Sequence, residues 1–212
     1  PVCGFRRAGR YRARVYHSCA AALGAGAIFG KVGRGCYPKT QEGSSAMTVT
    51  IRLEKPADKA AIYDITKRAF APMPFSGGDE QDLIDRLRDA DALEISLVAE
   101  MDSAVVGQVS FTRGVTADGS DDWYALGPVA VEPELQKQHV GSALINAGVA
   151  MLRERDAAGC VLVGNPEYYK RFGFRVFSEL APEGEPAEYY QILPLRVERP
   201  DIVVAFHPLF YG

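Results

Sequence analysis

The sequence predicts a mixed α/β domain in which helices cover both faces of a sheet. Thr48–Leu53 alternates apolar and polar residues, which is the pattern of a strand. Gly141–Ala157 instead places its apolar residues on one stripe at helical spacing. Along the whole chain the elements follow the order β-α-α-β-β-β-α-β-α-β-β, and this mixture of strands and helices is typical of a layered α/β fold.

The other elements are placed by periodicity and by turn residues. Pro56–Asp58 offers a helix start, and Ile62, Ile65 and Ala69 follow at helical spacing. Pro72–Gly78 marks a loop, because it is rich in proline and glycine. The remaining expected elements are a second helix at about 79–89, strands at 96–101, 105–115, 123–131 and 160–163, a short helix at 166–172, and closing strands at 174–177 and 202–206.

Residues 1–46 differ from the rest of the chain. They carry eight Lys and Arg and a single acid, Glu42, without sustained periodicity. Arginines ahead of the short apolar stretch Ala20–Phe29 are typical of a targeting segment. Regular structure is expected to begin at Met47, which favours the interpretation that residues 1–46 lie upstream of the true start of the protein. A functional arm is a third interpretation. We therefore assign the predicted domain to 47–212 and treat 1–46 as a basic leader.

Charge and cysteine usage argue against several classes of protein. The 24 Lys and Arg and 27 Asp and Glu of the chain leave 16 basic and 26 acidic residues in 47–212. Nucleic-acid binders neutralise phosphates with basic patches, so we expect no such partner, and an acidic domain suits an amine-bearing substrate. No apolar run reaches the ~18 residues of a membrane span. The scattered cysteines and histidines predict no metal site.

The strand Leu126–Val131 is interrupted by Gly127 and Pro128. Proline has no N–H group, and glycine within a strand often marks a bulge or a close backbone approach. Taken alone, the pattern fits a plain bulge of an edge strand. A splayed strand would instead offer backbone donors and acceptors to an extended ligand, such as a pantetheine arm, in the manner of an added strand.

A loop, Val131–Gly141, joins this strand to the long helix. It ends on a glycine at the helix entrance, where backbone N–H groups and the helix dipole favour an anion such as a pyrophosphate. The loop contains neither the Gly-x-Gly-x-x-Gly of a dinucleotide fold nor the Gly-Lys-Ser/Thr of a P-loop.

The letters of this loop resemble the acetyl-CoA-binding motif of the GNAT superfamily of N-acetyltransferases, Gln/Arg-x-x-Gly-x-Gly/Ala. Here the motif reads Gln136-x-x-His139-x-Gly141, with histidine in place of the first glycine, and the register Gln138-x-x-Gly141-x-Ala143 also fits. Histidine is tolerated there if its φ is negative or if the loop relaxes. The resemblance implies a mostly antiparallel, twisted sheet with a splayed central strand pair. It further implies that acetyl-CoA is bound by Val129, Val131, Gln136, Lys137, Gln138, His139, Val140, Gly141 and Ser142.

A second motif lies downstream. Tyr168–Phe174 resembles the family's Phe-Tyr-x-x-x-Gly-Phe. The match gives Tyr169 the role of the acid that protonates the departing thiolate, which a phenol can do because it is protonated at neutral pH. Gly164–Phe174 and the closing Ala205–Phe210 are similar to a YhbS-like branch of bacterial acetyltransferases.

The resemblance implies that an amine attacks the thioester directly. The N–H of Val129 would then stabilise the oxyanion. Glu80 is a weak candidate for the base that takes the proton of the amine, because an acid at a helix start is more often a surface residue. Asp121, Asp122 and a chain of water molecules are the alternatives.

The leading hypothesis is a cytoplasmic N-acetyltransferase with acetyl-CoA as co-substrate and a small-molecule or peptide amine as acceptor. Its strongest rival is a non-catalytic acyl-CoA binder with a sensing or regulatory role. An unrelated phosphate- or nucleotide-binding module would require both motif matches to be coincidental. We expect no membrane partner, and the sequence leaves a homodimer open.

Overall fold

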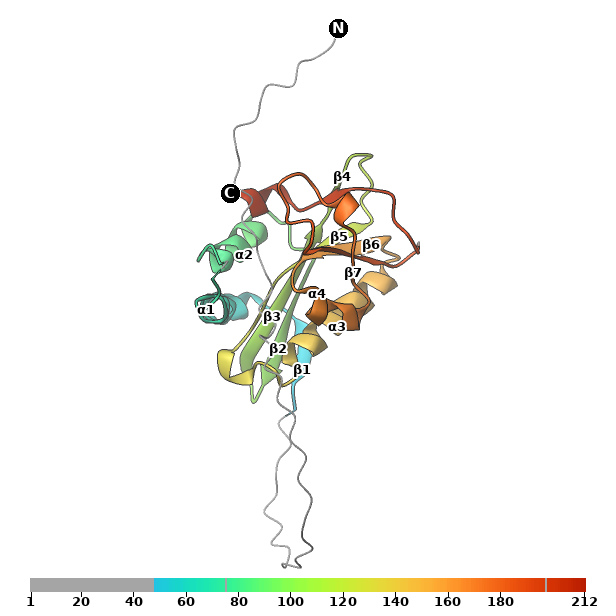
Figure 1. The fold of residues 1–212 in the computed structure, drawn as a ribbon. Helices are drawn as coiled ribbons and strands as arrows, with labels where there is room; N and C mark the ends of the chain where they lie inside the picture. Colours follow the sequence, from blue (N-terminus) through green and yellow to red (C-terminus); the bar gives the residue numbers. More distant parts are fainter. Residues whose placement is uncertain (1–47, 75, 197) are drawn as a thin grey trace, which may run out of the picture.

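The computed structural model describes residues 48–74, 76–196 and 198–212 (Figure 1). The predicted leader and Met47 lie outside the described residues. Within them, seven strands form one sheet in the order β1-β2-β3-β5-β6-β8-β7. These strands are β1 (Thr50–Leu53), β2 (Ile95–Met101), β3 (Ala104–Arg113), β5 (Trp123–Val131), β6 (Gly159–Val163), β7 (Arg175–Val176) and β8 (Tyr190–Pro194).

Helices cover both faces of this sheet. Figure 1 shows α1 (Lys59–Phe70) and α2 (Glu80–Asp89) on one side, and α3 (Val140–Glu154) and α4 (Pro166–Tyr169) on the other. Short 3-10 helices complete the chain: η1 (Pro56–Asp58), η2 (Pro133–Leu135), η3 (Lys170–Phe172), η4 (Ser178–Leu180) and η5 (Pro208–Tyr211). The predicted fold class, a mixed and mostly antiparallel sheet between helices, is confirmed. Among the described residues, no helix combines the length and the apolar character that crossing a membrane requires.

The central pair of the sheet is its parallel pair. Every other pair of neighbouring strands runs antiparallel, whereas β5 and β6 run parallel. Their register covers only Trp123–Ala125 against Gly159–Val161. Beyond these residues β5 continues for six residues without a partner on the β6 side. The pair is therefore splayed, as predicted.

The two faces of the sheet have separate apolar cores. On one face, Leu144 and Ile145 of α3 pack with Phe111 of β3. Gly148 brings α3 close to the sheet, because a Cβ built on it would lie 2.3 Å from two atoms of the Phe111 ring. On the other face, Leu83 of α2 packs in a cluster with Tyr190 of β8.

The end of the chain is the part of the fold that the sequence predicted least well. The expected strand at 202–206 is not part of the main sheet: β9 (Val204–Ala205) pairs with β4 (Val115–Thr116) in a separate two-stranded sheet. The main sheet instead contains β8, which was not predicted. Its residues are buried on both faces of the sheet, so apolar and polar residues do not alternate, and Gln191 is accommodated because its side chain donates to the Gly164 carbonyl at 2.8 Å.

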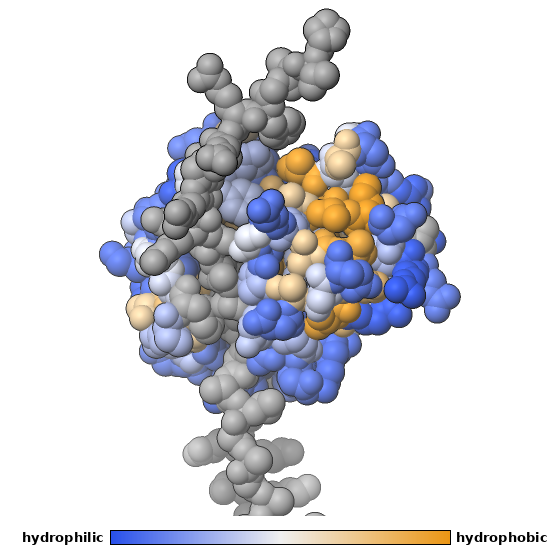
Figure 2. All heavy atoms as spheres, turned by 45° about the horizontal axis from the view of Figure 1, so that its top comes forward, coloured by the Kyte–Doolittle hydropathy of each residue, from blue (hydrophilic) through white to orange (hydrophobic). Residues whose placement is uncertain are grey.

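Exposed apolar side chains flank the two-stranded sheet. Val115 keeps 46% and Val203 keeps 43% of its surface exposed. Figure 2 shows apolar side chains gathered on this end of the molecule, which is the top of Figure 1 turned forward.

A bidentate ion pair fixes the first strand to the start of α1. The guanidinium of Arg52 contacts both carboxylate oxygens of Asp58, at 2.6 and 3.0 Å, and also binds Glu100 of β2. Lys55 N–H donates to the same Asp58 carboxylate at 2.7 Å. The hydrogen bond from Arg52 is the main reason that the pKa of Asp58 lies below its ordinary value.

Asp58→Asn is expected to lower the free energy of unfolding by about 1–3 kcal/mol at pH 7, because a charge-assisted pair is lost. The native pKa of Asp58 is depressed, so its contribution is complete above the unfolded pKa near 3.9 and is lost as the pH falls through the native pKa. Urea unfolding at pH 7 and at successively lower pH should therefore show a shrinking difference between variant and wild type. The exposed Asp64 of α1 provides the control Asp64→Asn. A difference that stays constant with pH would contradict the role of the ion pair.

Candidate functional site

The unpaired stretch of β5 presents backbone groups toward the gap between β5 and β6. Glu132 N–H donates to the Val106 carbonyl of β3 at 2.9 Å. Backbone groups alternate along a strand, so those of Val129 and Val131 point to the opposite edge, away from β3. The Val131 carbonyl accepts a hydrogen bond from the Gln136 side chain at 3.2 Å, which agrees with this direction.

A bulge lies in the middle of this stretch. Val129 is opposite Val109 and Leu126 is opposite Phe111, so two residues of β5, Gly127 and Pro128, face the single residue Ser110, and β5 carries one extra residue. Gly127 has a φ of 148°, in the region that favours glycine, and its peptide bond to Pro128 is cis. The predicted bulge is present, and the strand is internal to the sheet rather than at its edge.

The Pro128 carbonyl is held by buried polar side chains of β3. Gln108 donates to it at 3.3 Å, and Ser110 donates to the Gln108 side chain at 3.2 Å. Both side chains are fully buried. Strand β3 therefore fixes the backbone of the bulge as well as pairing with it.

The loop after β5 brings the start of α3 to the open end of the strand. A Cβ built on Gly141 would lie 3.5 Å from Val131 and 3.2 Å from the Tyr168 hydroxyl. An α-helix leaves its first N–H groups without acceptors inside the helix, so those of Val140, Gly141 and Ser142 are directed out of this end. The strand edge and the helix N-terminus are thus adjacent.

Two residues of the loop adopt the left-handed conformation. Lys137 has a φ of 65°, and His139, the residue before α3, has a φ of 67°. Of the two conditions expected for a histidine at this position, a negative φ or a relaxed loop, the negative φ is not met. Histidine is one of the non-glycine residues that enter this region more often than most, so the glycine of the family motif can be replaced without changing the turn.

Glycine and alanine at position 139 are expected to differ in stability. The left-handed conformation costs an L-residue about 1–2 kcal/mol and glycine almost nothing, so His139→Ala should be about 1 kcal/mol less stable than His139→Gly. Thermal and urea unfolding of the two variants measure the difference. Gln138, whose φ is not positive, is the matched control. Gln138→Gly should not be more stable than Gln138→Ala. Equal stability of the two variants at position 139 would contradict the assigned conformation.

Tyr169 lies at the end of α4, packed among aromatic rings. It is fully buried, and its ring centroid lies 5.0 Å from that of Tyr168 and 5.7 Å from that of Phe174. A Cβ on Gly164 would lie 2.5 Å from the Tyr169 ring, so the glycine at the end of β6 makes room for it. Asn165 caps the helix by accepting a hydrogen bond from the Glu167 N–H.

Tyr168 is a site residue that the sequence analysis missed. Its hydroxyl reaches the start of α3, where it lies 3.2 Å from a Cβ built on Gly141. Burial raises the pKa of Tyr168, and the nearby Ser142 side chain opposes this in part. The signal was present in the adjacent pair Tyr168–Tyr169, since consecutive residues of a short helix point in different directions. One tyrosine reaches α3 and the other fills the core beside β6.

Glu80 is not the surface residue that a helix-start acid usually is. It is fully buried, and its carboxylate accepts hydrogen bonds from the Ser76 hydroxyl at 2.8 Å and the Gly77 N–H at 2.9 Å. Asp121 is exposed, and Asp122 forms an ion pair with Arg196. Both aspartates precede β5, at the paired end of the β5–β6 pair, so the structure does not bring them to the opening.

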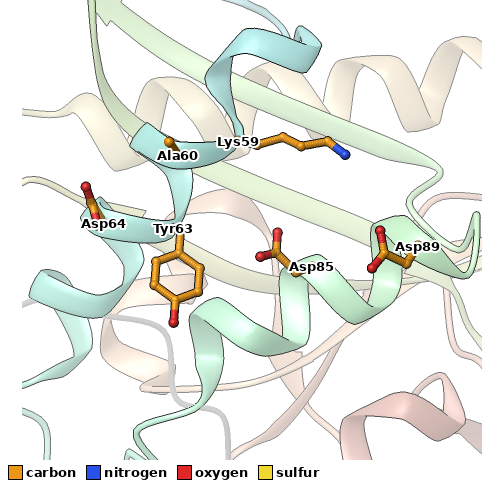
Figure 3. A pocket seen from close by; sticks show the side chains of 6 residues that line it. All are labelled: Lys59, Ala60, Tyr63, Asp64, Asp85 and Asp89. Carbon is orange, nitrogen blue, oxygen red and sulfur yellow. The ribbon is translucent and has the colours of Figure 1, made fainter.

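An acidic groove of about 390 Å³ lies between α1 and α2 (Figure 3). Its walls include Lys59 and Tyr63 of α1 and Asp85 and Asp89 of α2, with the strands behind the helices in this view. The Tyr63 hydroxyl donates to Asp82 at 3.0 Å. The groove therefore opens on the outer side of the helices, away from the loop and strand described above.

Comparison with known proteins agrees with this geometry. The family model of the acetyltransferase (GNAT) domain matches residues 92–176. A GNAT family acetyltransferase from Brucella melitensis, solved in complex with acetyl-CoA, is 39% identical, with a TM-score of 0.69 over 77% of this chain and 99% of that chain. The YhbS N-acetyltransferase from Escherichia coli, solved with CoA, is 26% identical, with a TM-score of 0.70 over 80% of this chain and 96% of that chain.

A curated relative extends the match at the level of sequence. The uncharacterized N-acetyltransferase YhbS of Escherichia coli (strain K12) is 33% identical over 128 residues, which are 59% of this chain and 73% of the relative. The chain therefore belongs to the GNAT acetyltransferase family.

Proposed function

We propose that this protein transfers an acetyl group from acetyl-CoA to a primary amine by direct attack of the amine on the thioester. The observation that carries the proposal is the open edge of β5 beside the N-terminus of α3, where the Val131 side chain lies 3.5 Å from a Cβ built on Gly141. Relatives that share the fold were solved with acetyl-CoA or CoA.

The residues present fit an extended ligand with an anionic group. The backbone groups of Val129 and Val131 point away from β3 and can pair with the amides of a pantetheine arm. The pyrophosphate would lie at the helix N-terminus, where N–H groups and the dipole favour negative charge. The residues proposed to contact acetyl-CoA are those expected from the sequence: Val129, Val131, Gln136, Lys137, Gln138, His139, Val140, Gly141 and Ser142.

Bound acetyl-CoA supplies an activated carbonyl carbon, and residues of this chain stabilise the developing charge and protonate the leaving group. The Val129 N–H stabilises the negative charge that develops on the carbonyl oxygen, from a strand whose bulge is fixed by Gln108. Tyr169 donates its proton to the departing sulfur. Holding amine and thioester together in one opening supplies much of the acceleration, so no covalent enzyme intermediate is required.

The acceptor proposed is a small-molecule or peptide amine, which suits a domain with an excess of acidic side chains. A cytoplasmic location is proposed for this activity, because the CoA pool that supplies acetyl-CoA is found there.

Calorimetry of the full chain with acetyl-CoA, CoA and ATP tests the cofactor site. We expect acetyl-CoA and CoA to bind and ATP not to bind. Release of CoA thiol in the presence of a linear polyamine, an amino sugar, a lysine-containing peptide and a peptide with a free N-terminus tests the transfer. Absence of binding would overturn the proposal. Binding without transfer to any amine would instead favour a non-catalytic acyl-CoA binder.

A further inference from the structure

The Pro128 carbonyl and the Val129 N–H belong to the same peptide unit. Among the described residues the cis bond is that between Gly127 and Pro128, so the bond from Pro128 to Val129 is trans. In a planar trans peptide the carbonyl and the N–H point in opposite directions. The Pro128 carbonyl points toward β3, where the Gln108 side chain donates to it at 3.3 Å. The Val129 N–H therefore points away from β3, toward the gap between β5 and β6.

The Gln108 side chain reaches this carbonyl from the face of the sheet that α1 covers. Gln108 is paired with Ala130 of β5, which packs with Ile65 of α1. Paired residues of neighbouring strands place their side chains on the same face. Tyr169 lies on the opposite face, in the core with α3. Gln108 can therefore influence the opening through the backbone of β5 while its own side chain stays beneath α1.

Ser110 determines which end of the Gln108 amide faces Pro128. Its hydroxyl donates to Gln108 Oε1 at 3.2 Å, so the oxygen end of the amide is held and the NH2 end is directed at the Pro128 carbonyl. A reversed amide would place its oxygen against the carbonyl oxygen, and two acceptors repel each other. Both side chains are fully buried, where hydrogen bonds are strong and a polar group without a partner is costly. The amide is therefore fixed in one orientation.

The bulge explains why this peptide benefits from a side-chain contact. Gly127 and Pro128 both face Ser110, and a bulge disrupts the regular ladder at this point. Pro128 also has no N–H group with which to pair. The ladder therefore constrains this peptide less than its neighbours, and the Gln108 amide provides an additional fixed contact. A hydrogen bond to the carbonyl also polarises the peptide, which makes its N–H a stronger donor.

We propose that Gln108 and Ser110 are positioning residues that orient and polarise the Val129 N–H toward the oxyanion of the acetyl transfer. The proposal rests on the proposed function, in which that N–H stabilises the developing negative charge. An oxyanion donor is effective because its direction is fixed before the reaction begins. The two side chains should therefore affect the chemical step and leave the affinity for acetyl-CoA nearly unchanged.

The infrared spectrum of bound acetyl-CoA, labelled with ¹³C at the thioester carbonyl, tests the donor without any acceptor amine. Donation to the carbonyl oxygen weakens the carbon–oxygen bond and moves its stretching band to lower wavenumber. Gln108→Met has a side chain of similar length that cannot donate. We expect Gln108→Met to lose about half or more of the wild-type band shift and Ser110→Ala to lose a smaller part, with the Kd of acetyl-CoA within about twofold of wild type.

Transfer to the best acceptor of the amine panel provides a second readout. We expect kcat to fall about 10–100-fold in Gln108→Met, which is less than the complete loss of an oxyanion donor, and to fall by a smaller factor in Ser110→Ala. Thr112→Val is the matched control. Thr112 follows Ser110 by two residues on the same face of β3, it is fully buried, and its hydroxyl has no hydrogen-bond partner among the described residues. This variant should leave the band and kcat unchanged.

The outcomes separate this proposal from the proposed function. A wild-type band position and kcat in both Gln108→Met and Ser110→Ala would overturn the positioning role alone. Parallel losses of acetyl-CoA affinity, kcat and thermal stability in Ser110→Ala, the milder variant, would show that the pair acts in packing and would also overturn it. A wild-type protein that shows the Gln108-dependent band shift but transfers to no amine would overturn the proposed transfer and support the positioning role. Binding of acetyl-CoA to the wild type without any band shift would overturn the role of the Val129 N–H and this proposal with it.

Discussion

Tyr169→Phe is expected to lower kcat about 10²–10³-fold while leaving the Kd of acetyl-CoA within about twofold of wild type. The phenol is the group that the family motif assigns to the departing thiolate, and a thiolate that leaves without a proton carries a full charge into a partly dry site. The ring makes its packing contacts with Tyr168 and Phe174 whether or not the hydroxyl is present. The variant should therefore keep its fold and its cofactor affinity.

Single-turnover release of CoA thiol and calorimetry with acetyl-CoA separate these two effects. Tyr63→Phe is the control, because it removes a hydroxyl on α1 that faces the outer groove rather than the opening. An unchanged kcat would remove Tyr169 from the mechanism. A parallel loss of binding and thermal stability would mean that its role is packing.

Gly148→Ala is expected to lower the free energy of unfolding by about 1–3 kcal/mol, although alanine is the better helix former by about 1 kcal/mol. The added methyl group would lie 2.3 Å from the Phe111 ring, which no carbon atom tolerates. Phe111 is fully buried and cannot move aside. Either α3 must lift from the sheet or β3 must shift, and both movements disturb the helix whose N-terminus borders the proposed cofactor site.

Urea unfolding measures this loss, and a double-mutant cycle assigns its cause. In the background Phe111→Leu, whose side chain is smaller, Gly148→Ala should cost markedly less than in wild type, so the two sites should be coupled. Equal costs in the two backgrounds would show that the strain arises elsewhere.

Elements with strong periodicity could be predicted from the sequence alone. The stripe of α3 predicted a helix at 141–157, and the structure has Val140–Glu154. Strand β8 could not be predicted in the same way, because burial on both faces removes the alternation that identifies a strand. The strand expected at 202–206 is present as β9 (Val204–Ala205), but the sequence did not show that its partner is the short β4 rather than a strand of the main sheet.

The candidate site also contains parts that could be predicted from the sequence and parts that could not. The bulge of β5 and the loop before α3 lie in one continuous segment, so glycine, proline and motif letters made them visible. The approach of the Tyr168 hydroxyl to the start of α3 is visible only in three dimensions, because the two belong to different elements. The conformation of His139 depends on backbone angles that the letters do not encode.

The short contact between β5 and β6 makes the sheet two units rather than one. Strands β1, β2, β3 and β5 form an antiparallel unit and β6, β8 and β7 form another, and among the described strands the two units pair only along the seam of Trp123–Ala125 against Gly159–Val161. A change in the angle between the units bends this seam and leaves the register inside each unit intact. A change in the width of the opening would therefore break few strand hydrogen bonds, and the apolar core beneath α3, which contains residues of both units, sets its limit.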